Sequence, residues 1–437
     1  MKRIQILIDK IKSSDIGKRM ATGAFWSFSG TALAKFIVLV ASIICAHVLG
    51  QKEYGEFGLV RSTINMFVVF GSAGLGLTAT KFIAEYKTNN KERINSIYIL
   101  TNGFAFITGL IVTIAILLAA PYLAVNMVKE PSLEPAIKVG ALLLFVTVIN
   151  AAQEGTITGF EDFKSRALNT LLGSIAESFF MILGGYLYGV IGAVLGYGTG
   201  FIVLYICNNI AISRNLNKNG IKRSLSDFEK KDLALLYKFS LPAALSSIMV
   251  APVFWIVRSM LVRFDSFSEL AIYEAADQWK VIILFIPSAV SQIVLPILSS
   301  IVKVDKTKFW RVLHYNLLLN TSIATLLTLL VCIFSGFIMR LYGTGYNNSM
   351  PLIILSISTI FTSLAAVIGI SIQSRAKMWI GFSFNCLWAI MTISFTFFYL
   401  LRGMGASGVA LGILSAYMLH ALFQYLYLRN SIKQDKE

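Results

Sequence analysis

The sequence predicts an all-α integral membrane protein. We expect twelve transmembrane helices in two six-helix lobes, related by a pseudo-two-fold axis along the membrane normal. Three observations predict this fold: an apolar composition, twelve long apolar stretches and an internal repeat. Of the 437 residues, 56% are hydrophobic and 14% are charged, and the mean hydropathy is +0.73. Soluble domains are about one quarter charged, so the composition excludes an ordinary soluble protein.

Each apolar stretch is long enough to cross about 30 Å of hydrocarbon at about 1.5 Å of helical rise per residue. The stretches are 21–49, 56–83, 95–120, 133–158, 165–188, 190–212, 235–263, 268–300, 309–340, 348–372, 378–400 and 404–428. The largest polar interruption follows the sixth stretch. We therefore predict an N-terminal lobe at 1–213, a cytoplasmic linker at 214–232 and a C-terminal lobe at 233–437. Apolar residues at helical spacing among Lys and Arg predict an interfacial basic helix at 1–18.

The internal repeat is clearest in Leu49–Tyr86, which contains the loop Glu53-Tyr54-Gly55. Its register returns in the second half of the chain at Glu269-Leu270-Ala271, and the spacing from Glu53 to Glu269 also separates Gly192 from Gly408. Each copy holds six helices, an even number, so both copies enter the membrane in the same orientation. This predicts an axis along the membrane normal and a cavity between the lobes.

The connections between the stretches carry Lys and Arg mainly on one side of the membrane. That side holds 27, the other side holds five, and six lie within the stretches, which accounts for all 38. The positive-inside rule then places both termini in the cytoplasm. The orientation of the chain in the membrane also explains the formal net charge of +16 better than nucleic-acid binding does. The basic residues are dispersed and form no continuous face that could bind a nucleic acid.

No catalytic or metal-binding motif stands out in the sequence. The four cysteines lie far apart in apolar stretches, without His or Cys neighbours at ligand spacing. The sequence has no Gly-x-x-x-x-Gly-Lys-Ser/Thr phosphate loop. The run Gly71-Ser72-Ala73-Gly74-Leu75-Gly76 lies within a stretch, where small residues allow close helix packing. We expect a protein that is not an enzyme, with no metal and no cofactor, and coupling to Na⁺ or H⁺ stays open.

A deep charge in the first lobe needs a specific explanation, because an ionised side chain near the bilayer centre costs about 2.5–3.5 kcal/mol. Lys35 lies 14 residues from either end of the first stretch and reaches water only if its helix faces a wet cavity. Glu177 lies equally deep in the fifth stretch. Two interpretations stay open: Lys35 pairs with Glu177, or it offers positive charge to an anion in the cavity.

The second lobe carries a charged helix face. Glu274, Asp277 and Lys280 follow one another at i, i+3 and i+6, so they lie along one side of a helix that cannot face lipid. Arg258 and Arg61 lie about 8–9 Å below the outer ends of their own helices, at about 1.5 Å per residue.

The repeat register makes Arg61 and Asp277 equivalent, since they are separated by the same spacing as Glu53 and Glu269. We expect either that they pair as an outer gate, or that Asp277 pairs with Lys280 or Arg258 within its own lobe. Glu154, near a cytoplasmic helix end, is ambiguous between a snorkelling and a functional role. The candidates for substrate binding are Lys35, Arg61, Arg258 and Lys280, and those for gating or coupling are Asp277, Glu274, Glu177 and Glu154.

Several of these motifs resemble a known family. Leu49-Gly50-x-x-Glu53-Tyr54-Gly55, followed by Gly74-Leu75-Gly76 and Lys81-x-x-Ala84-Glu85, is similar to the polysaccharide-biosynthesis flippases of the multidrug/oligosaccharidyl-lipid/polysaccharide exporter superfamily. Pro242 and Ser268-Glu269-Leu270-Ala271-x-Tyr273 fit the same pattern. The resemblance covers nearly the whole chain. In its expected number of helices, twelve, the chain is similar to the Wzx-type O-antigen translocases, whereas lipid II flippases usually have fourteen.

The resemblance implies a MATE-like fold and a multi-pass protein of the bacterial inner membrane. It implies that an undecaprenyl-diphosphate-linked oligosaccharide moves from the cytoplasmic to the outer leaflet by alternating access, for O-antigen, capsule or exopolysaccharide assembly. The expected partners are that lipid-linked oligosaccharide, membrane lipids and glycan polymerase machinery, with no nucleic acid. A diphosphate is anionic, which agrees with cations inside the membrane.

Two alternatives remain. An ion-coupled multidrug exporter of the same superfamily would bind organic cations and should present mainly carboxylates. The interior predicted here instead has more Lys and Arg than Asp and Glu. A membrane-embedded glycan polymerase or ligase would need catalytic residues, typically on a sizeable outer loop, and the longest outer connection is only about Pro121–Leu133.

Overall fold

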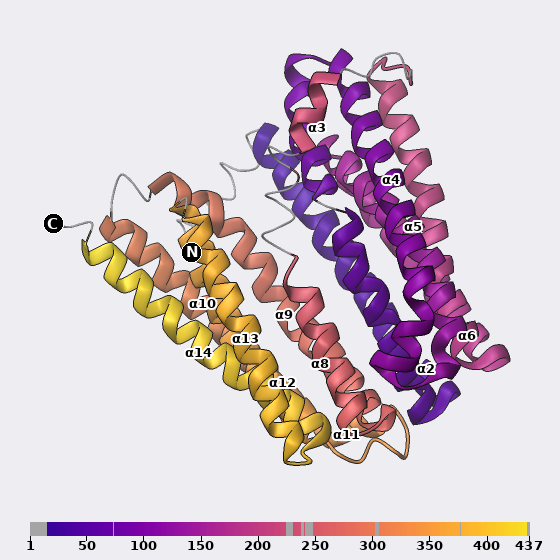
Figure 1. Cartoon of the computed structure of the whole chain (residues 1–437). Helices are drawn as coiled ribbons and strands as arrows, with labels where there is room; N and C mark the ends of the chain where they lie inside the picture. The colour runs from indigo at the N-terminus through magenta and orange to yellow at the C-terminus, as the bar shows by residue number, and fades with distance from the viewer. Residues whose placement is uncertain are drawn as a thin grey trace. The chain divides into compact units, whose positions relative to one another are not determined.

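A computed structural model of the chain describes residues 15–72, 74–223, 230–236, 240, 248–301, 306–375 and 377–434. Within these ranges the fold is helical and contains no β-strand (Figure 1). The predicted interfacial helix at 1–18 falls almost entirely outside the described residues, as do residues 224–229 of the predicted linker.

The chain divides into two compact units. Unit 1 comprises Met1–Ser42, Thr63–Ala124 and Pro131–Ile248, and unit 2 comprises Ile43–Ser62, Val125–Glu130 and Met249–Glu437. Residues 43–62, from the first half of the sequence, therefore belong to the compact unit that contains most of the second half. The lobe boundaries given by the sequence stay a prediction.

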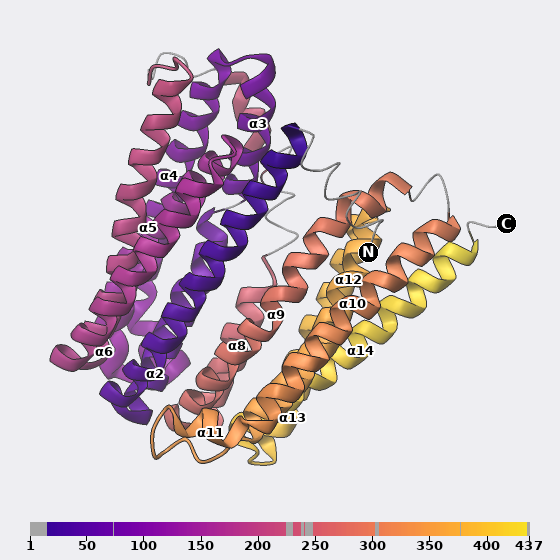
Figure 2. The ribbon, with the colours of Figure 1, turned by 180° about the vertical axis from the view of Figure 1, so that it is seen from behind.

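Unit 1 is built around α4, α5 and α6, with α3 packed against α4 and α5 (Figure 2). Its described elements are most of α2 (Asp15–Ser72), α3 (Leu75–Asn89), α4 (Glu92–Tyr122), the 3₁₀ turn η2 (Pro131–Leu133), α5 (Glu134–Gly159), α6 (Phe163–Lys218) and η4 (Lys230–Leu233). Small residues allow the close contacts inside this unit. A Cβ on Gly76 would lie 2.7 Å from the carbonyl oxygen of Ala151, and one on Gly155 would overlap the backbone of Gly76. The predicted close packing at Gly76 is thus confirmed.

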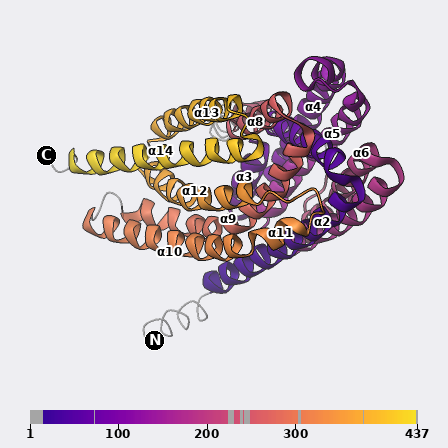
Figure 3. The same cartoon turned by 90° about the horizontal axis from the view of Figure 1, so that it is seen from below.

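Unit 2 is a bundle in which α14 lies between α12 and α13, while α9 packs against α10 and α12 (Figure 3). Its helices are α8 (Val250–Phe264), α9 (Phe267–Ile301), α10 (Lys306–Ile333), α11 (Ser335–Arg340), α12 (Met350–Ser374), α13 (Met378–Leu401) and α14 (Gly405–Gln434). Most of the π-helical segment η1 (Leu123–Val128) and residues 43–62 of α2 complete it.

Each of the twelve predicted spans contains helix in the part of the chain that the structure describes. Among the described residues, eight helices are long and apolar enough to cross a membrane. One of them, Phe163–Lys218, holds two predicted spans, and another, Thr22–Ser72, holds the first predicted span and most of the second. These two helices break at Gly50 (φ 73°) and at Gly189 (φ 58°). Such positive φ values favour glycine, because a Cβ would clash with the backbone. Gly405, which the repeat register makes equivalent to Gly189, also has a positive φ, of 49°. The two halves of the repeat therefore share this backbone conformation as well as the glycine.

Three predicted spans differ from a single continuous helix. The second is interrupted at Gly74, whose left-handed conformation (φ 72°) separates α2 from α3. The ninth is interrupted at Phe334, between α10 and α11. In the seventh, residues 248–249 form a turn and α8 begins at Val250, which places Pro252 in its first turn, where proline costs no helical hydrogen bond.

Candidate functional site

The segment of α2 after Gly50 packs closely against α9 within unit 2. Gly55, Gly58 and Arg61 are three residues apart, so they share one face of the helix. A Cβ on Gly55 would overlap the carbonyl oxygen of Phe267, and one on Gly58 would lie 2.6 Å from Cγ of Glu274. These two glycines bring the backbone of α2 against the first turns of α9. Arg61 is thereby placed beside Glu274.

The start of α9 is fixed by one capping interaction of its own and by a contact with the start of α14. The hydroxyl oxygen of Ser266 accepts a hydrogen bond from the backbone nitrogen of Glu269, at 3.2 Å. Such a contact satisfies an N–H group that has no partner inside the helix. The carboxylate of Glu269 in turn accepts a 2.7 Å hydrogen bond from the backbone nitrogen of Ala406, at the start of α14. The first turn of α9 is thus held by its own cap and by a neighbouring helix.

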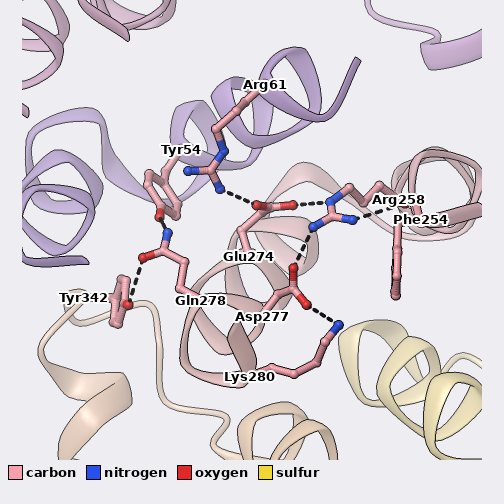
Figure 4. Close-up of polar contacts among 9 residues, drawn as sticks. All are labelled: Tyr54, Arg61, Phe254, Arg258, Glu274, Asp277, Gln278, Lys280 and Tyr342. Carbon is pink, nitrogen blue, oxygen red and sulfur yellow. Dashed lines mark hydrogen bonds and ion pairs between the residues drawn. The ribbon is translucent and has the colours of Figure 1, made fainter. Parts of the chain in front are cut away.

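Five ionised side chains in unit 2 form a continuous series of alternating charge, which we call the charge chain: Arg61, Glu274, Arg258, Asp277 and Lys280 (Figure 4). Arg61 Nη2 lies 2.7 Å from Glu274 Oε2, and the other oxygen of Glu274 accepts from Arg258 Nε. Arg258 Nη2 donates to Asp277 Oδ2 at 2.9 Å, and Lys280 Nζ lies 2.6 Å from Asp277 Oδ1. Each carboxylate therefore bridges two cations.

The charge chain is largely removed from solvent. Glu274 is the most buried member, with 2% of its side chain exposed, and Arg61 is the most exposed, at 17%. A buried charge is tolerated when it is paired and its hydrogen-bonding groups are satisfied. Three cations and two carboxylates leave one net positive charge. The arrangement can therefore hold an additional anionic group, or exchange one of its carboxylates for one.

Phe254 supports the cationic end of the charge chain. Its carbonyl oxygen accepts a 3.2 Å hydrogen bond from Arg258 Nη1, and Lys280 Nζ lies 4.4 Å from the centre of its ring. A cation over an aromatic face gains about 0.5–2 kcal/mol, depending on its desolvation. The two cations on either side of Asp277 thus share one aromatic neighbour.

A neutral polar group lies next to the charge chain. Gln278, one turn after Glu274, donates from Nε2 to the hydroxyl of Tyr54 at 2.6 Å. Its Oε1 accepts from the hydroxyl of Tyr342 at 3.5 Å, and Figure 4 shows the two tyrosines on either side of the amide. Both tyrosines are almost fully buried. These contacts join the repeat segment at 53–58 to α9 and to the segment after α11.

The structure brings together three of the four predicted cations, namely Arg61, Arg258 and Lys280, in unit 2. Lys35 belongs to unit 1, where it is half-buried and forms no hydrogen bond or ion pair with any residue that the structure describes. The suggested pairing of Lys35 with Glu177 is therefore not present. Glu154 also lies in unit 1, with its carboxylate 3.4 Å from Arg166 Nη2.

The suggested pairing of Arg61 with Asp277 is not formed either. Arg61 bonds to Glu274, and Asp277 bonds to Arg258 and Lys280, which is the alternative that the sequence left open. Side chains on a helix lean toward its N-terminus. The long side chain of Arg61 therefore extends toward the level of Gly58, where the carboxylate of Glu274 lies.

Sequence reasoning missed Phe254, Tyr54, Gln278 and Tyr342. Gln278 had a usable signal, because it follows Glu274 at i+4 and so shares the charged side of α9. Tyr54 lies in the repeated loop but was not assigned a partner. Nothing in the sequence pointed to Tyr342, which comes from a distant turn. Among the described residues, no group of three or more His, Cys, Asp or Glu side chains could hold a metal ion.

Residues 20–302, more than half of the chain, match the family described as "Polysaccharide biosynthesis protein". A curated relative, the EPS I polysaccharide export inner membrane protein EpsE of Ralstonia solanacearum, is 25% identical over 415 residues. The match covers 92% of this chain and 92% of that relative.

Solved structures share the fold. A multidrug resistance MATE family transporter of the MOP superfamily, in an inward-facing conformation, matches with a TM-score of 0.81 and 19% identity, over 92% of this chain and 95% of that chain. A MOP superfamily transporter from Pyrococcus furiosus also matches, with a TM-score of 0.71 and 18% identity, over 96% of both chains. The description of that structure reports a reverse polarity of its binding pocket. The predicted MATE-like, all-helical membrane fold is confirmed.

Proposed function

Because the chain belongs to the polysaccharide biosynthesis protein family, we propose that it is a flippase for an undecaprenyl-diphosphate-linked oligosaccharide. At the coarser level, it is a polysaccharide-related membrane transporter and not an enzyme. The proposal adds the lipid-linked substrate, movement from the cytoplasmic to the outer leaflet of the bacterial inner membrane, and cytoplasmic termini. The name of the Ralstonia relative, an inner membrane export protein for a polysaccharide, supports the same location and class of cargo.

The charge chain is the observation that carries this proposal. Its cations outnumber its carboxylates by one. Arg61 lies on a helix that is long and apolar enough to cross a membrane. A site of this polarity suits an anionic headgroup, since Arg binds phosphate oxygens with charge-assisted hydrogen bonds. An organic cation would meet repulsion at the same place. The proposal includes coupling of transport to Na⁺ or H⁺ and a contact with glycan polymerase machinery.

Transport in proteoliposomes tests the function. The purified chain would be reconstituted with a fluorescent sugar attached to a short polyprenyl diphosphate, and the label accessible to a membrane-impermeant quencher would be followed with time. We expect the wild-type protein to equilibrate the label between leaflets, and Arg258→Gln to slow this at least about tenfold, as the loss of about 1.4 kcal/mol of binding would.

A matched control is Arg340→Gln, which removes an exposed arginine from the last turn of α11 and should leave transport unchanged. Movement of a cationic dye such as ethidium, with no movement of the polyprenyl diphosphate sugar, would contradict the flippase and favour a drug exporter.

A further inference from the structure

Every nitrogen of the Arg258 guanidinium already donates to an acceptor of the protein. Nε bonds to Glu274, Nη2 bonds to Asp277 at 2.9 Å, and Nη1 bonds to the carbonyl oxygen of Phe254 at 3.2 Å. Arg258 itself is 9% exposed. A substrate anion that binds along the Nε–Nη2 edge of this arginine must therefore displace a carboxylate of the protein.

The two carboxylates are arranged in a specific pattern. They lie next to each other along the Nε–Nη2 edge of one guanidinium, and each is bonded on its far side to a further cation, Arg61 for Glu274 and Lys280 for Asp277. Arginine usually presents this edge to both oxygens of a single carboxylate or phosphate. Here the same edge holds two separate anionic groups.

A diphosphate has the chemistry to replace this pair. Its two phosphate groups are joined by one oxygen, so they are adjacent anionic groups with several acceptor oxygens each. One phosphate would take the position of Glu274, between Arg61 and Arg258, and the other the position of Asp277, between Arg258 and Lys280. A lone phosphate or a sugar carboxylate fills only one of the two positions.

We propose that Glu274 and Asp277 are built-in counter-anions that occupy a diphosphate subsite and are displaced when a diphosphate binds. The proposal rests on the proposed function and names the part of the substrate that the charge chain recognises. A diphosphate diester carries one negative charge on each phosphate, so it replaces the two carboxylates charge for charge, and the net charge of one positive among the three cations and their anionic partners is kept. The site is therefore close to neutral in both states, which limits the cost of burying it.

Displacement of Glu274 also has a consequence for α2. The ion pair with Glu274 ties Arg61, and with it the segment 43–62 from the first half of the sequence, to α9 in unit 2. A bound phosphate in the same position offers Arg61 a replacement partner. The ligand thus replaces the contact between Arg61 and Glu274 with a contact between Arg61 and its own phosphate. A ligand that interacts differently with two conformations in this way can shift the balance between them.

Binding of inorganic pyrophosphate to the purified full-length protein in detergent tests the proposal by calorimetry. Glu274→Gln removes the competing charge but keeps the shape of the side chain. We expect it to bind pyrophosphate about tenfold more tightly than the wild type, because a charge-assisted hydrogen bond no longer has to be broken. The matched control is Glu134→Gln, which neutralises a carboxylate 2.7 Å from Lys138 on α5 and should leave pyrophosphate binding unchanged.

Two further arms keep the test decisive. Glu274→Asp keeps the charge but is one methylene shorter and reaches Arg61 poorly, so it should tighten pyrophosphate binding by a smaller factor even if Glu274→Gln does not fold. Orthophosphate and a short-chain phosphatidic acid should bind the wild type at least about tenfold more weakly than pyrophosphate, since each fills one position. Equal binding of these single phosphates would overturn the diphosphate assignment and indicate a general phosphate or lipid headgroup site.

The outcomes separate this proposal from the flippase itself. Unchanged or weaker pyrophosphate binding by folded Glu274 variants would overturn the counter-anion role while transport of the polyprenyl diphosphate sugar could still be observed. Tighter binding by these variants, with no transport by the wild type, would instead support the subsite and contradict the flippase. Failure of the wild type and of the variants to bind pyrophosphate would overturn the subsite.

Discussion

Gly58 and Glu274 lie against each other although they come from different halves of the sequence, at positions that the repeat register makes equivalent. A Cβ on Gly58 would lie 2.6 Å from Cγ of Glu274. One half therefore contributes a hydrogen atom at this position and the other half contributes a carboxylate. Equivalent positions meet, but their chemistry differs, and the space left by glycine is what admits the side chain that Arg61 and Arg258 share.

Arg258 should be the most sensitive member of the charge chain for stability. Its substitution by Gln leaves two carboxylates, one of them 2% exposed, without their shared partner. Breaking a buried ion pair from one side costs about 3–5 kcal/mol. We expect a clear fall in the midpoint of thermal unfolding of the detergent-purified protein, followed by circular dichroism. Arg258→Lys should recover only part of it, and Arg340→Gln should behave as the wild type.

Gly55 should not tolerate even one added methyl group. In Gly55→Ala the new Cβ would overlap the carbonyl oxygen of Phe267, a backbone atom that cannot rotate away. Overpacking of this kind costs about 1–3 kcal/mol. Gly103→Ala on α4 is the control, because a Cβ there meets nothing within 4 Å. In that helix interior, alanine should stabilise by about 0.5–1 kcal/mol. Equal unfolding midpoints for the two variants would show that the contact is loose.

Lys35 should matter for transport more than for stability. It forms no bond with the described residues, so Lys35→Ala removes no pairing and should leave the unfolding midpoint unchanged or higher. We expect the same variant to reduce transport of the polyprenyl diphosphate sugar, and Lys35→Arg to retain part of it. The control Lys138→Ala removes an exposed lysine that is paired with Glu134 and should transport normally.

The Glu177 variant separates substrate binding from internal neutralisation. If Lys35 served only to balance Glu177, the double change Lys35→Ala with Glu177→Ala would restore transport. Because the structure does not pair these two residues, we expect the double variant to transport no better than Lys35→Ala. Recovery in proteoliposomes would contradict a role for Lys35 toward the substrate.

The orientation of the chain can be measured with single cysteines in a variant that lacks the native four. A cysteine at Ser226 or Lys306 should react with a membrane-impermeant maleimide only after the cells are opened. A cysteine at Lys129 or Gly403 should react in intact spheroplasts. This follows from the 27-to-five distribution of Lys and Arg between the two sides. Labelling of Ser226 from outside would overturn the predicted orientation and, with it, the predicted two-lobe arrangement.

Local patterns in the sequence predicted much of this protein. Each of the twelve apolar stretches contains helix among the described residues. The predicted ends of the first and fifth stretches lie next to Gly50 and Gly189, where the structure shows the long helices to break. The period of the α-helix was enough to place Glu274, Asp277 and Lys280 on one side of α9. The interruptions at Gly74 and Phe334 were missed, because an apolar stretch has the same hydropathy whether its helix is continuous or broken.

The sequence by itself determined that these charges lie within long apolar stretches, since hydropathy and helical period depend only on residues near one another in the chain. Only the tertiary structure decided which charges meet. The partner of Arg61 depends on how closely α2 approaches α9, which is set by the absence of a side chain at Gly55 and Gly58. The direction in which the arginine extends along its helix then selects Glu274, because an ion pair forms between atoms a few ångströms apart and not between equivalent positions of a repeat.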